Sequence, residues 1–422
     1  MLPITILIIV LLVFINYYLS GRSAMYPPVV FCSVWTVDLL LLWGCGSYFH
    51  AVSVPTLFII TCGCAVFSIG SLAVFLFPPR RPKRQFFSDR SNHNLSLLVF
   101  LIALGVPFFL RWVLAIASKS DAATLLMAVR IATVRGAEDL PAGYSLFMNM
   151  VSVAMIVAMI SFCEKGKLRT VVALCLAILL SLLTGAKVGV FLLLGSVMAI
   201  DSMVNRRRIR WKVIAVVFLA LIVVFGFVSM EVHTGRASPG ASLVDNLVSV
   251  SHLLAAYTVG GIVAFDRVVR DPSVVPHNWS ISRVFLLTLN KLGAHFQVPS
   301  LNANYVDVGY NAYPENVYTF YFAYLDYGFA GMMFIVLALG YIIAHFYTLA
   351  RSGSKISLLI YSSLFTGLAL SAFSEYFFLN LNFLAKLYCI SWLFYRLPVQ
   401  WRARAGKREA SDRPPVPEPS AG

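Results

Sequence analysis

Charged side chains that could bind a phosphorylated substrate gather in two loops of this sequence. The first loop, about 118–144, contains lysine and arginine, and the second, about 231–327, combines arginines, histidines and carboxylates. Arginine neutralises phosphate through paired hydrogen bonds, and a histidine or carboxylate can take a proton from a hydroxyl. A loop as long as the second one is typical of a functional segment. Ordinary solvated charge is the alternative for any one of these side chains.

Two of the arginines stand beside glycine. Arg135 precedes Gly136, and Arg236 closes the segment His233-Thr234-Gly235-Arg236. Glycine lets the backbone and the guanidinium approach a phosphate together, so Arg135 and Arg236 are the leading candidates for pyrophosphate binding. Arg130 and Lys187 are further candidates. Lys187 follows the tight turn Thr184-Gly185-Ala186, where its side chain could instead reach lipid headgroups.

A polar stripe is predicted where the second loop returns to the membrane. Asn316, Thr319, Ala323 and Asp326 are spaced three, four and three residues apart, which places them on one face of a helix. Asn316 and Thr319 would bind sugar hydroxyls, and Asp326 would act as a base, with His233 and His295 as rival bases. The structural alternative is an interface anchor in which Asp326 caps the following helix.

The sequence contains none of the motifs that bind nucleotides or metals. It has no P-loop, no dinucleotide fingerprint and no His-Glu-x-x-His, and its seven cysteines lie in or beside apolar stretches. We therefore expect neither a metal nor a cofactor.

The composition predicts that membrane helices position these loops. The chain is 59% hydrophobic and 12% charged, with a mean hydropathy of +0.82. A soluble domain carries about 25% charged residues. Apolar stretches long enough to span a bilayer predict an all-α polytopic protein of about eleven transmembrane helices. The candidate spans are 2–19, 28–49, 54–77, 95–117, 145–162, 170–184, 186–203, 213–230, 328–349, 357–374 and 378–396.

The basic residues predict the orientation. Runs at 80–84 and 206–212 lie in short connections, which is typical of the cytoplasmic side. This places the N-terminus outside, the loop 231–327 on the outer face and the C-terminus inside. The net charge of +15 therefore indicates membrane topology rather than nucleic-acid binding.

Two segments do not fit a simple span. The stretch 244–266 is apolar, but a span there would move the basic tail outside, so we interpret it as interfacial or re-entrant. The transmembrane domain is predicted over 1–396. The cytoplasmic tail, 397–422, is basic and then proline-rich, and we expect it to be disordered.

Four ionisable residues are predicted at membrane depth: Asp38, Arg111, Glu375 and Lys386. Such residues face protein or water rather than lipid. Lys386 could pair with Asp38, either as a structural ion pair or as part of a proton relay.

The sequence resembles the O-antigen or oligosaccharide repeat-unit polymerases (Wzy-type). The resemblance lies in the overall architecture, in the turn 184–187, which is similar to a Thr-Gly-Ser-Arg turn, and in Asn316-x-x-Thr319 followed by Asp326-Tyr327-Gly328-x-x-Gly331 and Gly340. Ala186 and Lys187 depart from the serine and arginine of that turn, and a lysine cannot make the bidentate phosphate contact of an arginine.

This resemblance implies a membrane glycosyltransferase with a GT-C-like fold in the bacterial inner membrane. It would transfer a growing glycan from undecaprenyl pyrophosphate to a lipid-linked repeat unit on the outer face. Its partners would be the lipid-linked oligosaccharide, membrane lipids, a chain-length regulator and a flippase. The alternatives are an O-antigen ligase and a transporter or flippase of the lipid-linked unit. A flippase should carry charges along the depth of its bundle, whereas here they concentrate at one face.

Overall fold

The computed structural model describes twelve segments of the chain. These are residues 1–79, 89–118, 142–165, 187–205, 258–274, 282–298, 305–309, 314–316, 320–321, 323–373, 375–378 and 380–396.

The described segments are mostly helical. The α-helices are α1 (Leu2–Leu19), α2 (Pro27–Cys45), α3 (Val54–Leu76), α4 (Asp89–Ala117), α6 (Ala142–Lys165), α8 (Lys187–Asn205), α11 (Arg283–Lys291), α12 (Tyr324–Arg351), α13 (Lys355–Ala369) and α14 (Leu381–Arg396). A further helix covers 258–270. Two short 3-10 helices are η1 (Gly46–Tyr48) and η2 (Pro272–Val274).

Five helical stretches are long and apolar enough to cross a bilayer: Leu2–Leu19, Pro27–Tyr48, Val54–Leu76, Leu95–Ala115 and Tyr324–Arg351. The chain is therefore a helical membrane protein. All but two of the predicted spans coincide with helices of the structure, and those two, 170–184 and 213–230, lie outside the described residues. The count of eleven and the orientation stay predictions.

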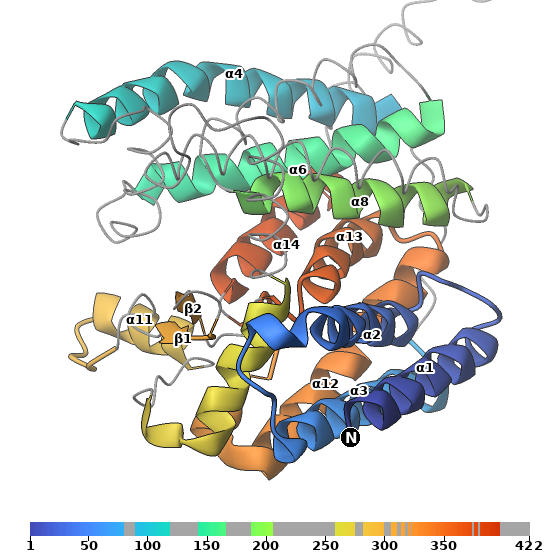
Figure 1. Cartoon of the computed structure of the whole chain (residues 1–422). Coiled ribbons are helices and arrows are strands. Elements are labelled where there is room, and N and C mark those ends of the chain that lie inside the picture. Colours follow the sequence, from blue (N-terminus) through green and yellow to red (C-terminus); the bar gives the residue numbers. More distant parts are fainter. Residues whose placement is uncertain are drawn as a thin grey trace, which may run out of the picture.

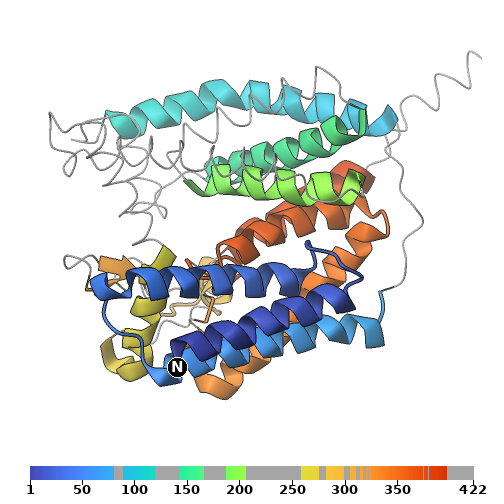
Figure 2. The ribbon, with the colours of Figure 1, turned by 45° about the vertical axis from the view of Figure 1, so that its right-hand side comes forward.

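The helices form two groups with α13 and α14 between them (Figure 1). On one side, α4 packs on α6 and α6 on α8; on the other, α1, α2, α3 and α12 pack together. Helix α13 contacts both α8 and α12, so it connects the two groups. After a rotation of 45° about the vertical axis, the long helices of both groups are seen to run alongside one another (Figure 2).

The tightest packing joins α3 to α12. A Cβ at Gly70 would lie 2.1 Å from the carbonyl oxygen of Leu337, and one at Gly340 would lie 2.4 Å from that of Phe67. The hydroxyl of Ser71 also donates to the Gly340 carbonyl at 3.0 Å. Small residues bring two backbones together in this way in membrane proteins. Phe58 stacks on Phe329 nearer the start of both helices, so α3 and α12 run parallel.

Helix α12 begins with a break. Gly328 has φ 62° and ψ −168°, a conformation essentially restricted to glycine, between the short turn at Tyr324 and the long membrane helix. The glycine therefore sets the angle at which the chain enters the bundle.

The helix 258–270 lies in the protein interior. Eight consecutive residues, Val259 to Asp266, are buried. An interfacial helix would leave an apolar face to lipid, so the described part of the stretch 244–266 is not interfacial. Residues 244–257 lie outside the described part.

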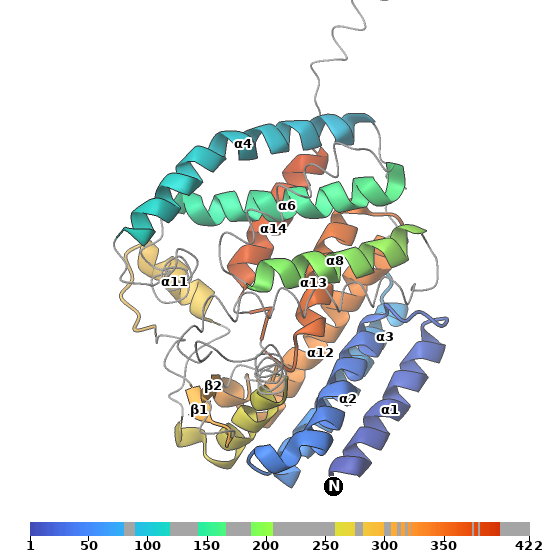
Figure 3. The ribbon, with the colours of Figure 1, turned by 45° about the horizontal axis from the view of Figure 1, so that its top comes forward.

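A small hairpin departs from the predicted all-α fold. Strand β1 (Tyr305–Asp307) pairs antiparallel with β2 (Pro314–Asn316), with Val306 opposite Glu315. Figure 3 shows the hairpin and α11 on the same side of the molecule.

Candidate functional site

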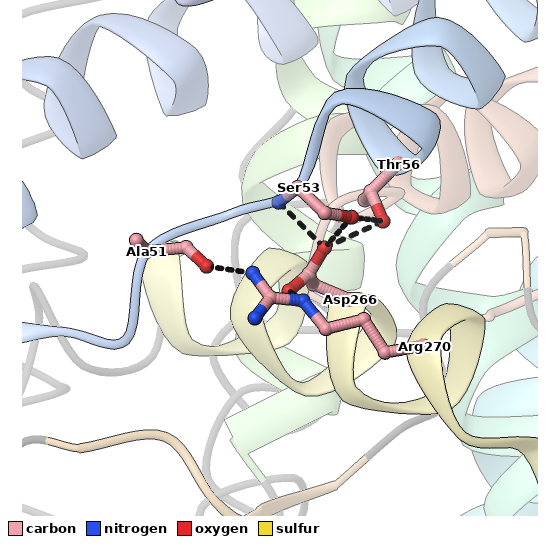
Figure 4. Close-up of polar contacts among 5 residues, drawn as sticks. All are labelled: Ala51, Ser53, Thr56, Asp266 and Arg270. Atoms are coloured by element: carbon pink, nitrogen blue, oxygen red, sulfur yellow. Dashed lines mark hydrogen bonds and ion pairs between the residues drawn. The ribbon is translucent and has the colours of Figure 1, made fainter.

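A buried carboxylate lies where the α2–α3 connection meets the helix 258–270 (Figure 4). Oδ1 of Asp266 accepts the Ser53 backbone N–H at 2.8 Å, the Ser53 hydroxyl at 2.5 Å and the Thr56 hydroxyl at 2.7 Å. The Asp266 side chain is 1% exposed. Ser53 is the N-cap of α3 and Thr56 its third residue, where a capping box would place glutamate. Asp266 thus supplies the capping carboxylate from 210 residues away in sequence.

The second oxygen of Asp266 holds an arginine. Arg270 Nε lies 2.7 Å from Asp266 Oδ2, one helical turn further along, and Nη2 of Arg270 donates to the Ala51 carbonyl. The Arg270 side chain is still 46% exposed. Its guanidinium is therefore fixed in orientation on one edge and open to solvent on the other, which suits the binding of an anion.

A histidine and a carboxylate meet at the residue before Ala51, whose carbonyl Arg270 binds. The His50 N–H donates to the Val308 carbonyl at 3.0 Å, and His50 Nε2 lies 3.8 Å from Asp307 Oδ2. Both side chains are about half exposed. Asp307 Oδ1 also accepts the Gly309 N–H at 2.8 Å, and Gly309 has φ +93°. A Cβ at Gly309 would lie 2.9 Å from the His50 nitrogen, so the close approach requires glycine.

One further carboxylate ends the helix that carries Arg270. Asp271 is exposed, and its Oδ1 accepts the N–H and the hydroxyl of Ser273 at 3.0 and 2.6 Å. These hydrogen bonds lower the pKa of Asp271, so its charge remains over most of the working pH range. The site formed by His50, Asp266, Arg270, Asp271 and Asp307, called the rim below, therefore holds charges of both signs.

Aromatic rings pack against the helix 258–270 at the residue before Asp266. Tyr321 is fully buried and packs against Trp35 and Phe265, with ring centroids 4.9 and 6.1 Å away. Its hydroxyl donates to the Ile60 carbonyl at 3.3 Å. These ring contacts hold the side of the helix 258–270 at Phe265 against α2 and Tyr321.

Two of the predicted base candidates lie in described segments. Asp326 is half-buried in the first turn of α12, whose N-cap is Ala323, so Asp326 does not take the N-cap position. His295 is exposed in the segment that follows α11. Within the described segments, neither hydrogen bonds nor ion pairs connect Asp326 or His295 to Arg270.

The predicted polar helix stripe is wrong at its first residue. Asn316 is the last residue of β2 and pairs with Tyr305, so it cannot share a helical face with Asp326. Pairing with β1 decides the local conformation there, and α12 begins only at Tyr324. Lys187 begins α8. The remaining predicted site residues lie outside the described segments: Arg130, Arg135, His233, Arg236 and Thr319.

The ion pair expected at membrane depth is not formed. Asp38 is buried on α2, Lys386 is half-buried on α14, and no ion pair joins them in the described part of the chain. Glu375 is also buried, and its carboxylate accepts the N–H groups of Phe377 and Phe378 at 2.7 and 2.9 Å. These bonds satisfy irregular backbone between α13 and α14. Among the residues described, no three potential metal ligands come together.

The sequence analysis missed the residues that the fold brings closest together. Asp266 and Arg270 are spaced like a helical ion pair at the end of an apolar stretch, and this spacing could have identified them. His50 carried no comparable local signal, because its contacts come from β1, more than 250 residues later.

In comparisons with known proteins, neither a family model, nor a curated protein, nor a solved structure matched the chain. The function is therefore argued from the membrane architecture and from this site.

Proposed function

We propose that the chain is a membrane glycosyltransferase of the bacterial inner membrane that polymerises undecaprenyl-pyrophosphate-linked oligosaccharide repeat units on the outer face. The observation that carries this proposal is Arg270. A buried carboxylate fixes its Nε edge, while 46% of the Arg270 side chain stays exposed at the end of a bundle of membrane helices. A side chain held in this way is preorganised for phosphate.

The predicted topology supports the position of the site. It places the short connection 50–53 and the loop 231–327 on the same outer face. His50, Arg270 and Asp307 come from these two regions, and the structure brings them to one end of the bundle. The parallel course of α3 and α12 agrees with spans that both run from the outer to the inner side.

The proposed reaction needs one proton acceptor and one group that stabilises the leaving anion. The acceptor sugar hydroxyl loses its proton to a base, and its oxygen bonds to the anomeric carbon of the donor glycan. The bond from that carbon to the phosphate oxygen breaks, and undecaprenyl pyrophosphate leaves with its negative charge neutralised by arginine. Arg270 would fill the second role, together with the candidates Arg135 and Arg236.

The base is proposed among four side chains. His50 has Asp307 beside its Nε2 at 3.8 Å and lies next to Ala51, whose carbonyl Arg270 binds. Asp326, His233 and His295 remain candidates from the sequence. We favour His50, because it precedes Ala51, whose carbonyl binds Arg270, the side chain that we propose for pyrophosphate binding.

The glycan profile of a strain lacking this chain tests the activity class. A polymerase predicts loss of the long-chain ladder with a single repeat unit retained on the acceptor. Loss of all repeats would instead indicate the ligase or the flippase.

Arg270→Gln in a complemented strain tests the site. The loss of a charge-assisted contact made mainly in the transition state should lower polymerisation by about 30- to 1000-fold. Arg267→Gln is the matched control: it removes the same charge one turn earlier, from an exposed side chain, and should leave the ladder unchanged. Each protein level is measured in the membrane fraction. A full-length ladder from Arg270→Gln would remove Arg270 from the site.

Reporter fusions after Arg270 and after Arg404 test the topology. The predicted map places the two points in opposite compartments. The same compartment for both would overturn it.

A further inference from the structure

Helix α11 leaves an apolar face uncovered. Phe285, Leu289 and the C-cap residue Leu292 follow one another at helical spacing, and Phe296 lies in the segment after the helix, tied to Asn290. These side chains are 61%, 44%, 79% and 48% exposed. Four large exposed apolar groups within twelve residues form an apolar surface on this segment.

The tip of this helix is a built structure. The side chain of Asn290 donates to the Phe296 carbonyl and accepts the Phe296 N–H, both at 2.8 Å. Gly293 turns the chain with φ +102°, and the Ala294 N–H donates to the Leu289 carbonyl at 3.0 Å. These hydrogen bonds hold the tip together while the side chains of Leu292 and Phe296 stay exposed.

The start of α11 is attached to the first turn of α12. The side chain of Ser282, its N-cap, hydrogen-bonds the side chain of Tyr327. Tyr327 is in the first turn of α12, which is long and apolar enough to cross a bilayer. The apolar face of α11 thus begins where α12 enters the membrane.

The charges of this segment have one sign. Arg283 begins α11 and Lys291 ends it, and the sequence 282–298 contains no aspartate or glutamate. Cations beside an apolar helix face are typical of helices that lie in the headgroup region and attract anionic lipid.

We propose that α11 and its tip, residues 282–298, dock on the same bilayer that the chain spans, with Phe285, Leu289, Leu292 and Phe296 inserted among the acyl chains and the cationic segment attracted to anionic headgroups. The bilayer is the occupant because Ser282 holds the helix beside the entry of α12, where lipid is always within reach. This docking would anchor the long outer loop, and it does not depend on the proposed function.

Fluorescence depth measurements on the full chain test the docking. A genetically encoded fluorescent amino acid replaces Leu292 in one protein and the exposed Asp271 in the other, each reconstituted in nanodiscs of phosphatidylcholine and phosphatidylglycerol. Brominated acyl chains should quench the probe at 292 severalfold more than the probe at 271, and aqueous iodide should show the reverse order. Iodide quenching of both probes to the same extent would overturn the proposal. Shielding of the 292 probe from both quenchers would also overturn it and would indicate a protein partner or a second copy.

The lipid charge is tested separately. Lys291→Gln should weaken attachment of the segment about fivefold in anionic nanodiscs, the effect of one cation near such a surface. The readout is the loss of quenching by brominated lipid, and the difference from the parent should vanish in pure phosphatidylcholine. An equal loss in both lipids would overturn the role of anionic headgroups.

Discussion

The seam between α3 and α12 and the rim around Asp266 are held together in opposite ways. In the seam, glycines let backbone atoms meet, with Gly70 and Gly340 leaving no room for a methyl group. At the rim, polar groups reach across loops, and Arg270, His50 and Asp307 stay about half exposed.

The difference separates stability from chemistry. The contacts described in the seam join backbone atoms and the Ser71 hydroxyl, and they hold the two helices together. The rim combines one fully satisfied carboxylate, Asp266, with groups that keep donors and acceptors for a ligand. Asp266 is therefore a positioning residue, and the groups around it are the ones available for chemistry.

The largest effect is expected at Asp266. Asp266→Ala leaves the Ser53 N–H and the Thr56 hydroxyl without their acceptor and releases Arg270. Unsatisfied buried donors should lower the free energy of unfolding by about 2–4 kcal/mol. Thermal unfolding in detergent measures this loss. Asp266→Asn keeps an acceptor oxygen and should lose less; equal losses would show that the hydrogen bonds to Oδ1 contribute little.

A smaller loss is expected in the seam. Gly340→Ala places a methyl group against the Phe67 carbonyl and should destabilise the protein by about 1–3 kcal/mol. Gly44→Ala is the matched control, because a Cβ there meets nothing within 4 Å in α2. The same assay compares the two variants. If Gly340→Ala unfolds at the temperature of the parent, the seam is looser than its geometry indicates.

The smallest change in stability is expected at Asp307. Asp307→Asn removes an exposed ion pair with His50 but keeps an oxygen for the Gly309 N–H, so the free energy of unfolding should change by less than about 0.5 kcal/mol. Polymerisation should nevertheless fall if Asp307 orients a histidine base. An unchanged ladder would direct the search for the base to Asp326, His233 and His295.

The positions of the helices could be predicted from the sequence, but which helices pack against one another could not. Apolar length defines α1, α2, α3 and α12 within a few residues, because the bilayer imposes that length. Which helices pack together depends on complementary surfaces, such as the one that the glycines of the seam create. A glycine in an apolar stretch of sequence does not show which helix will pack against it.

The site was harder to predict than the fold. The spacing of Asn316, Thr319 and Asp326 matched a helix, but three positions cannot distinguish helical spacing from coincidence, and pairing with β1 prevailed. The rim includes His50, Asp266 and Asp307, which are far apart in the sequence. Only the fold joins them.

The hydrogen bond between Ser53 and Asp266 can form only after both residues have been synthesised. The two residues are 213 positions apart, so at about 5–20 residues per second a ribosome needs roughly 10–40 s to make the second after the first. During this interval the start of α3 is inserted without its capping carboxylate. The site therefore closes late in synthesis, and a chain interrupted before residue 266 would expose an uncapped helix end to quality control in the membrane.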